Sequence, residues 1–369
     1  MSMMPILRPT VAEVDLKKLA RNMHKVHEQA GPGVRVLTVL KANAYGHGAV
    51  PLGLFLEKNK LSDSFGAASV EEALQLRQAG VTLPILVLGS IYPFEAFEYA
   101  VKNDIAITIA SMDAAKAVCQ IAEKLGKKAL CHVKQDTGMG RIGTRRGNVF
   151  SVIEFLAKNP FVILDGFFTH LSSVETDPDF TEEQIGYYRD TLTNIQLHGI
   201  HVNHCHVAAS AAITARPDVH YDMVRTGHSA FGLDKGFEPI LSLKTRVVYV
   251  KDLPAGFSVS YNRSFIASQN MKVATLPLGY GDGYLRALSN KASVLIRGKR
   301  CPILGNITMD MLMVDITNAG PVCVGDEAVA VGRQGDEEIT FAELAQQAGT
   351  IDYELCTLLM PRVPRIYKE

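Results

Sequence analysis

Residues 34–48 read VRVLTVLKANAYGHG, an apolar run that ends in a lysine and is followed by small residues and glycines. The run from residue 34 to 40 is nearly continuous rather than alternating, which is typical of a parallel strand covered by helices. We therefore expect the first strand of an α/β fold here, with Lys41 at its carboxyl end.

Seven similar runs follow, and helical patterns lie between them. The eight expected strands are 34–40, 64–69, 84–89, 105–110, 128–136, 164–171, 201–208 and 219–225. About eight strand–helix alternations over ~200 residues predict a closed (β/α)8 barrel of the TIM type. A doubly wound open sheet is the alternative, but no G-x-G-x-x-G motif follows the first strand.

Several of the intervening helices have readable ends. Ser69 with Glu72 has the spacing of a capping box, and Thr181 with Gln184 has the same spacing before another helix. Ser111 is expected to cap a helix that ends at Gly126.

The texture changes after Gly236. Short strand patterns recur between glycines, prolines and asparagines, and one good helix is expected, from Thr340 (boxed with Glu343) to about Ala348. We expect a barrel domain over 1–238, whose first strand can pack on the second domain, and a mainly β domain over 239–369.

The composition excludes several classes of protein. The 369 residues are 47% hydrophobic and 21% charged, and 38 Lys+Arg balance 38 Asp+Glu. A neutral chain without a basic run is a poor partner for nucleic acid or an anionic membrane. No signal peptide and no apolar segment of about 20 residues is visible. Six scattered cysteines are expected to be reduced thiols, so a cytoplasmic protein is predicted.

In a parallel barrel the active site lies at the carboxyl ends of the strands. Lys41 is the sharpest candidate there, because an unpaired ammonium is costly to bury. A lysine with a lowered pKa is a good amine nucleophile for a carbonyl compound. Amide groups around Ser210, Gly227 and His228 could hold a phosphate at helix starts. A lysine beside a phosphate cradle suits pyridoxal phosphate (PLP). The polar residues also found at or just past the strand ends are Tyr45, Lys134, Arg141, His170, His206 and Arg225.

Seven motifs occur in order along almost the whole chain: VLKANAYGHG, DTGMGRIG, FFTHLSS, MVRTGHSAFGL, VSYNRSF, LPLGYGDGY and RVPRIY. Together they resemble the alanine racemase family of fold-type III PLP enzymes. The resemblance implies racemisation of L-alanine and D-alanine that supplies D-alanine for peptidoglycan. It also implies a cofactor on Lys41, no metal, and a homodimer with shared active sites.

The resemblance assigns the two bases. Lys41 serves the face of D-alanine, and Tyr261 of the second subunit takes the proton from L-alanine. His170 is expected to favour the phenolate of Tyr261 through a hydrogen bond.

The remaining roles also come from the resemblance. Arg225 faces the pyridine nitrogen and His206 orients its guanidinium. Arg141 contacts the cofactor's phenolic oxygen and the substrate carboxylate, and Lys134 is a lysine that many members carry as a carbamate. Phosphate contacts are expected from Tyr45, Ser210, Gly227 and His228, the substrate carboxylate at the amide of Met309 beside Asp310, and the entry at Tyr280.

Four positions depart from the family pattern: Ala209, His228, Thr308 and Pro361. Ala209 and Thr308 could enlarge or polarise the substrate pocket, so a racemase of serine or of several small amino acids is an alternative. A fold-type III decarboxylase, which needs no second base, would share the barrel and the cofactor lysine. A non-catalytic PLP-binding protein would share the barrel alone, and the expected β domain argues against it.

Overall fold

The computed structural model describes residues 7–369, apart from the side chain of Arg146. The chain divides into two compact units. The barrel unit contains residues 20–44 and 49–230, and the strand unit contains the chain up to Leu19, residues 45–48 and residues 231–369.

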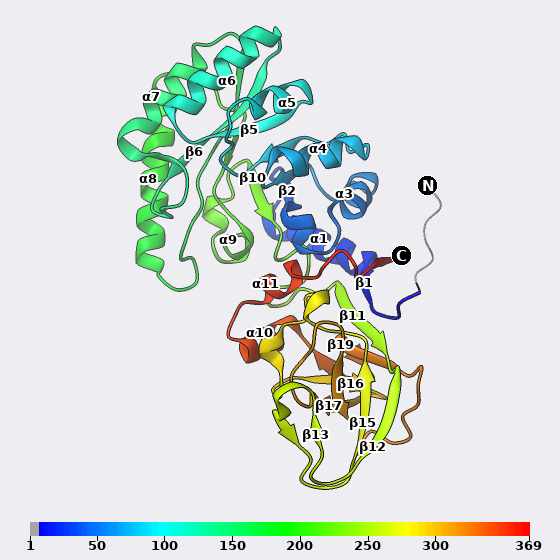
Figure 1. Cartoon of the computed structure of the whole chain (residues 1–369). Helices are drawn as coiled ribbons and strands as arrows, with labels where there is room; N and C mark the ends of the chain where they lie inside the picture. The colour runs from blue at the N-terminus through cyan, green and yellow to red at the C-terminus, as the bar shows by residue number, and fades with distance from the viewer. Residues whose placement is uncertain (1–6) are drawn as a thin grey trace. The chain divides into compact units, whose positions relative to one another are not determined.

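The barrel unit is built on eight parallel strands with helices outside them (Figure 1). The order along the sheet is β10-β2-β3-β4-β5-β6-β8-β9. A bridge between Ala209 and Arg225 and the bond from the Asp222 amide to the Cys205 carbonyl connect its two edges. The expected (β/α)8 architecture is therefore confirmed. The strands are β2 (Arg35–Val39), β3 (Ser64–Ala67), β4 (Ile85–Val87), β5 (Ile105–Ile109), β6 (Ala129–Asp136), β8 (Val162–Phe168), β9 (His204–His206) and β10 (Met223–Thr226), with the short β7 (Thr144–Arg145) beside β6.

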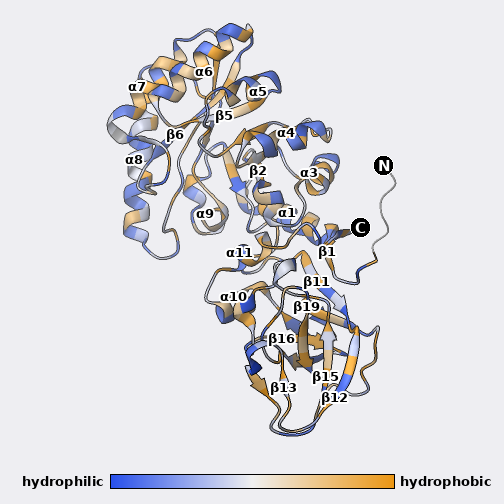
Figure 2. Cartoon of the chain, in the orientation of Figure 1, coloured by the Kyte–Doolittle hydropathy of each residue, from blue (hydrophilic) through white to orange (hydrophobic). Residues whose placement is uncertain are grey.

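The helices that cover the strands contain both hydrophobic and hydrophilic residues. Figure 2 shows this for α6, α7 and α8 as a mixture of orange and blue. The strands themselves are buried almost throughout, which explains their unbroken apolar pattern. The helices are α1 (Leu16–Ala30), α3 (Ala49–Lys58), α4 (Val70–Gln78), α5 (Ala96–Lys102), α6 (Met112–Leu125), α7 (Arg146–Ala157), α8 (Pro178–Leu197) and α9 (Ser210–Ala215), with the one-turn segment α2 (Lys41–Tyr45) and the 3-10 turn η1 (Pro217–Val219).

The capping residues expected from the sequence are correct for α6 but not for α8. Ser111 accepts a hydrogen bond from the Ala114 amide and Gly126 ends α6 with φ of 59°, as expected. The start expected at Thr181 is wrong, because α8 begins three residues earlier. Asp177 caps it by accepting from the Phe180 amide, and a proline occupies the first turn.

The strand unit is mainly β, as expected. Its largest sheet has the order β17-β16-β19-β11-β1-β21, so the first strand of the chain, β1 (Val11–Asp15), pairs with β11 (Leu241–Arg246) and with the last strand, β21 (Arg365–Lys368). The other strands are β12 (Tyr249–Leu253), β13 (Ser258–Val259), β14 (Phe265–Ile266), β15 (Met271–Leu276), β16 (Ser293–Ile296), β17 (Lys299–Pro302), β18 (Leu312–Asp315), β19 (Glu327–Gln334) and β20 (Glu337–Ile339), with the 3-10 turns η2 (Tyr261–Arg263), η3 (Tyr280–Asp282) and η4 (Arg286–Leu288).

Residues 239–369, all of which the structure describes, contain two α-helices rather than the one expected. Thr340 caps α10 (Phe341–Ala348) through the Glu343 amide. The second helix, α11 (Asp352–Thr357), follows Ile351, an apolar residue that cannot cap its start, so the sequence offered no signal for it.

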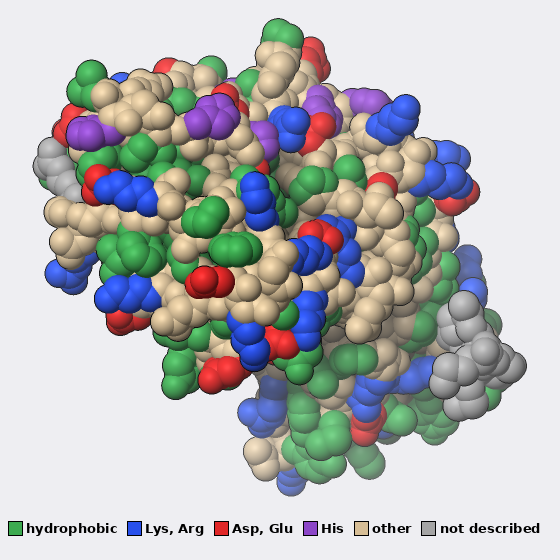
Figure 3. Space-filling model, turned by 90° about the horizontal axis from the view of Figure 1, so that it is seen from above, with side chains coloured by type: hydrophobic (Ala, Val, Ile, Leu, Met, Phe, Trp, Pro, Cys, Tyr) green, Lys and Arg blue, Asp and Glu red, His purple; other side chains and the backbone are tan. Residues whose placement is uncertain are grey.

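Charges of both signs are interspersed with apolar groups over the face shown in Figure 3. Within the described part of the chain, no helix combines the length and apolar character needed to cross a bilayer.

Candidate active site

Lys41 follows β2 and precedes a left-handed turn. Ala42, Asn43, Ala44 and Tyr45 all have φ between 51° and 54°, so the chain makes a left-handed helical turn directly after the lysine. Each such residue costs about 1–2 kcal/mol, except asparagine, which tolerates this region better. Such strain persists only where surrounding contacts hold it.

Glu72 of α4 provides one of those contacts. Its carboxylate accepts from the Ala42 amide at 2.8 Å and from the Ala68 amide at 2.7 Å. The capping box expected at Ser69 is therefore one-sided. Ser69 accepts from the Glu72 amide, but the Glu72 carboxylate binds the Lys41 turn and Ala68.

Lys41 is half-buried, and burial lowers the pKa of its ammonium, with a further lowering by the charge of Arg141. The negative charge of Glu72 raises the pKa of Lys41. This lowering favours the neutral amine, which is the form of a lysine that acts as a nucleophile or a base.

Lys134 of β6 is buried to 4% exposure in the barrel interior. Burial lowers its pKa to about 8, and the charges of Arg225, Arg141 and Lys41 contribute to that lowering, while Asp136 opposes them. Its ammonium lies 5.4 Å from the centre of the Phe168 ring. Four cationic side chains thus gather at the carboxyl ends of the strands.

Arg225 of β10 is buried and held by five hydrogen bonds. One nitrogen, Nη1, donates to His206 Nδ1 at 2.8 Å and to the His206 carbonyl at 3.1 Å. The other, Nη2, donates to the carbonyls of Thr169 and Val207 at 2.8 and 2.9 Å, and to His170 Nδ1 at 3.4 Å. Burial lowers the pKa of Arg225 to about 10, so it stays charged at neutral pH.

His206 continues this network away from the strand ends. Its Nε2 lies 3.0 Å from His132 Nδ1, and His132 Nε2 lies 3.1 Å from a carboxylate oxygen of Asp165, which also accepts from Asn203. Because the guanidinium can only donate, His206 Nδ1 must accept, and so His206 Nε2 and then His132 Nε2 carry the protons. We call Arg225, His206, His132 and Asp165 the interior relay.

His132 and Asp165 were not among the residues predicted from the sequence. His132 lies two residues before Lys134 on β6, so the two side chains share a face and period-two reasoning could have placed His132 inside the barrel. Asp165 could not have been found this way, because the β6–β8 register shifts at Cys131/His132 and pairs His132 with Gly166. A Cβ on Gly166 would lie 2.0 Å from His132 Nδ1, so only glycine leaves room for the ring.

His170 follows β8. Burial lowers the pKa of His170 to about 3, and Arg225, Lys134 and Arg141 contribute to that effect. The ring is therefore neutral, with Nδ1 accepting from Arg225 and Nε2 carrying the proton as a donor.

Ser210 begins α9, and its hydroxyl accepts from the amides of Gly227 and Ser229 at 3.3 and 3.5 Å. The amides after β10 therefore converge on the start of α9. His228 lies half-buried between them in sequence.

The strand unit holds the remaining candidates. Tyr45 packs on Phe231 with ring centres 5.5 Å apart, and burial raises its pKa to about 12. Tyr261 is 69% exposed on a turn in which Ser260, Asn262 and Arg263 have positive φ.

Hydrogen bonds connect the three loops of the strand unit that carry Tyr261, Tyr280 and the pair Met309 and Asp310. The Tyr261 carbonyl accepts from Asn306 at 2.8 Å, and the Tyr280 amide donates to the Thr308 carbonyl at 3.1 Å. The Met309 carbonyl accepts from Arg362, which also pairs with Asp310 at 2.9 Å.

Comparisons with known proteins cover the whole chain. The family model "Alanine racemase, N-terminal domain" matches residues 14–235, and "Alanine racemase, C-terminal domain" matches residues 240–367. The chain is 41% identical to an alanine racemase of Symbiobacterium thermophilum, over 98% of this chain and 97% of that one.

The chain belongs to the alanine racemase family.

Solved structures agree with this assignment. An alanine racemase from Clostridium difficile superposes with a TM-score of 0.93 at 35% identity, covering 99% of this chain and 97% of that one. The alanine racemase of Bacillus anthracis with bound L-Ala-P superposes with a TM-score of 0.92 at 33% identity, covering 99% and 96%.

Enzymes of the alanine racemase family depend on PLP, and the residues of the barrel unit fit that cofactor. PLP carries a phosphate and a phenolic oxygen, and its substrate adds a carboxylate. The charge of Arg141 lowers the pKa of Lys41, and the charges of Arg225, Arg141 and Lys41 lower the pKa of Lys134. The four cations attract such anions, which would relieve their repulsion. Lys41 is the amine that would hold the aldehyde, and Ser210 with Gly227 the groups that would hold the phosphate.

Proposed function

We propose that this member of the alanine racemase family interconverts L-alanine and D-alanine, with the Lys41 amine and the Tyr261 phenol as the two bases. The observation that carries the proposal is the position of Lys41, on a strained turn at the end of β2 with a lowered pKa among cations. The relatives reported above are all alanine racemases, which favours this reaction over serine racemisation, decarboxylation or binding without catalysis.

The Cα–H of alanine is far too weak an acid for a side chain alone. Bound PLP supplies an electron sink for the charge that develops at Cα. Racemisation then needs a proton acceptor on one face and a donor on the other. Lys41 Nζ holds the proton on the D-alanine side, and Tyr261 Oη on the L-alanine side.

His170 supports the role of Tyr261 in this proposal. A phenol titrates near pKa ~10 and needs a hydrogen-bond donor to act as a base near neutral pH. The neutral His170 ring, with its proton on Nε2, is such a donor.

Arg225 sets the protonation of the cofactor ring in this proposal. Its guanidinium keeps its protons at neutral pH, so a pyridine nitrogen facing it would accept a hydrogen bond and stay unprotonated. An unprotonated ring is a weaker electron sink, which would limit side reactions such as transamination. The bonds to His206, Thr169 and Val207 fix the guanidinium in place.

A homodimer with shared active sites is part of the proposal. Tyr261, Tyr280, Met309 and Met311 are 69%, 41%, 54% and 45% exposed on the connected loops of the strand unit. Isologous pairing would bury these side chains and deliver Tyr261 to the partner's barrel. All six cysteines are free thiols, which suits a cytoplasmic enzyme that provides D-alanine for peptidoglycan.

Lys134 is proposed to carry a carbamate. Its lowered pKa leaves a substantial fraction of neutral amine near pH 8, which can add to CO2 with loss of one proton. The resulting anion could pair with Arg141 and remove one buried positive charge.

The test is solvent deuterium incorporation at Cα, starting from each enantiomer. Lys41→Ala removes both the base for D-alanine and the amine proposed to hold the cofactor, so it should abolish exchange from both enantiomers. Tyr261→Phe should block racemisation and exchange from L-alanine, yet retain exchange from D-alanine. Tyr249→Phe, an exposed tyrosine of β12, is the matched control and should behave as wild type. Equal loss of exchange from both enantiomers in Tyr261→Phe would reject the assignment of faces.

A further inference from the structure

The barrel unit has a cavity at the end of the strands opposite Lys41. It has a volume of about 350 Å³ and is lined by the first residues of five strands. These are Arg35, Ser64, Ile85, His204 and Met223, of β2, β3, β4, β9 and β10. None of the residues proposed above for catalysis or cofactor binding lines it. We call it the barrel-foot cavity.

Its wall is mostly apolar. The side chains that give it this character are Leu37, Ile85, Leu86, Ala106, Leu130 and Met223. A cavity of this kind favours a ligand with an aliphatic body, because such a body gains by leaving water.

Two opposite charges remain available at its edge. Arg35 is exposed, and its Nη1 lies 3.3 Å from His204 Nε2. Asp165 keeps its negative charge at neutral pH, since hydrogen bonds from His132 and Asn203 hold its pKa at about 2 although burial acts to raise it. Both carboxylate oxygens keep lone pairs for a further donor.

The other two charged residues of the cavity are already satisfied. Arg77 donates to the carbonyls of Val81, Leu83, Asn103 and Asp104. The carboxylate of Asp104 pairs with Lys127 at 2.9 Å.

A buried polar atom also belongs to this cavity. Ser64 is 6% exposed, and its hydroxyl has no hydrogen-bond partner among the residues that the structure describes. A buried hydroxyl without a partner is costly, and a polar group of a ligand would satisfy it.

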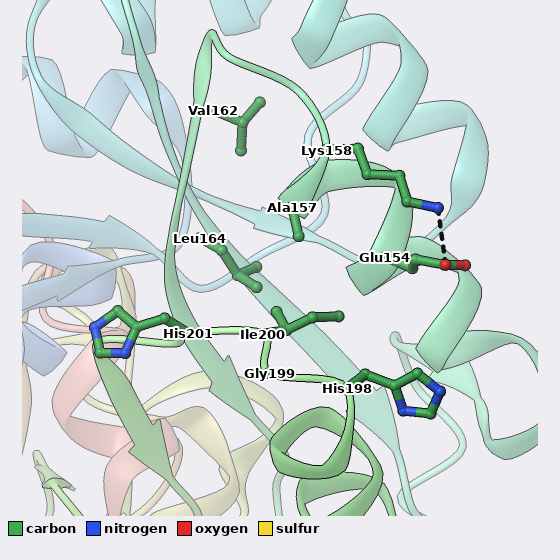
Figure 4. A pocket seen from close by; sticks show the side chains of 9 residues that line it. All are labelled: Glu154, Ala157, Lys158, Val162, Leu164, His198, Gly199, Ile200 and His201. Atoms are coloured by element: carbon green, nitrogen blue, oxygen red, sulfur yellow. Dashed lines mark hydrogen bonds and ion pairs between the residues drawn. The ribbon is translucent and has the colours of Figure 1, made fainter.

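The pocket in Figure 4 is less suited to a zwitterionic ligand than the barrel-foot cavity. It has a volume of about 480 Å³ and lies beside α7 and the loop before β9. Its charged residues, Lys158 and Glu154, pair with each other at 2.8 Å, so it offers no unmatched charge pair.

We propose that the barrel-foot cavity binds a small zwitterion with an aliphatic side chain of leucine size, such as free leucine, because the single methyl group of alanine would cover too little of the apolar wall. The ligand's carboxylate faces Arg35, its ammonium faces Asp165, and its side chain occupies the apolar wall. His132 and Asp165 of the interior relay also line this cavity. Neither Lys41 nor Tyr261 lines it, so the proposal does not depend on their proposed roles.

The test uses N,N-dimethyl-L-leucine, a zwitterion whose tertiary amine cannot condense with the aldehyde of PLP. Isothermal titration calorimetry on the holoenzyme should show one saturable site per chain. Saturating L-alanine, which occupies the catalytic site, should leave this binding unchanged. The two analogues with one charge each, N,N-dimethyl-3-methylbutylamine and 4-methylpentanoate, should bind at least about tenfold more weakly.

Two variants locate the site. Ala106→Leu fills the cavity and Arg35→Met removes one charge, and each should weaken binding at least about tenfold. Arg333→Met, on the exposed surface of the strand unit, should have no effect. The absence of saturable binding at millimolar concentration, competition by L-alanine, or equal binding of either analogue would overturn the proposal. If Ala106→Leu fails to fold, Arg35→Met decides alone.

Discussion

The carboxylate of Glu72 lies 2.8 Å from the amide nitrogen of Ala42, the residue after Lys41. With its second oxygen on the Ala68 amide, Glu72 ties the ends of β2 and β3 together across the start of α4. Such charge-assisted bonds are stronger than neutral ones, which suits a turn held in a strained conformation. The position of Lys41 therefore depends on a side chain from a separate helix.

Replacing Glu72 tests this dependence. Glu72→Ala leaves two amides without their acceptor and should lower the free energy of unfolding by about 1–3 kcal/mol. Because the turn carries Lys41, kcat should also fall. Glu71→Ala, in the same helical turn but exposed, is the control and should leave kcat unchanged. Equal kcat in wild type and Glu72→Ala would show that the turn is held by other contacts.

Gly166→Ala should be among the most damaging single methyl additions in the barrel. The new Cβ would lie 2.0 Å from His132 Nδ1, so the ring must move and the relay must break. Overpacking of this kind costs about 1–3 kcal/mol, and loss of the His132–His206 bond adds to that. Thermal unfolding and kcat/KM measure the two effects. Gly186→Ala, on α8 where an added Cβ meets nothing within 4 Å, is the control. An unchanged Tm would contradict the geometry.

Asp165→Asn tests the interior relay while preserving side-chain size. The carboxylate makes His132 a better acceptor, which in turn strengthens the acceptor that Arg225 meets at His206. Loss of the charge should lower kcat by about tenfold and shift the absorption band of the bound cofactor, whose ring Arg225 is proposed to face. Asn203→Ala keeps the charge and should change kcat by less than about twofold. Identical spectra in Asp165→Asn and wild type would separate the relay from the cofactor.

Stability should fall on mild acidification. The pKa of His170 is lowered to about 3 and that of His206 is lowered strongly, both chiefly by burial, so each ring is neutral when folded. The unfolded chain takes up a proton on each below its ordinary value of 6.5, and the folded chain does not. The stabilisation is therefore complete above pH 6.5 and is lost as the pH falls.

Between pH 6.5 and about 5, before the carboxylates titrate, the free energy of unfolding should drop by about 1.4 kcal/mol per pH unit for each such histidine. Unfolding by guanidinium chloride at pH 7, 6 and 5 gives the free energy of unfolding at each pH and hence this slope. His170→Asn should reduce this slope by the contribution of one histidine. A slope of zero across this window would refute the neutral assignment.

Local patterns were sufficient for much of this molecule. Eight buried apolar runs predicted the barrel, because a parallel strand covered by helices must be apolar along its whole length. Lys41, Arg225 and His206 were visible as candidates because polar residues at strand ends of a barrel converge. Period-two alternation could also have marked His132.

Other features depend on residues that meet only in the folded chain. The start of α8 at Pro178 was missed because two capping signals, Asp177 and Thr181, lie one turn apart, and packing decides between them. Glu72 has the sequence signature of a local cap, yet its carboxylate serves a turn at the end of another strand. Asp165 reaches His132 through a register shift between β6 and β8, and β1 joins the strand unit by pairing with β11 and β21. The sequence alone determined the strands of the barrel and most of the helices, because periodicity and capping are local, but it missed α11 and the start of α8. The tertiary structure decided the left-handed turn and the relay, since both depend on hydrogen bonds between segments far apart in the chain.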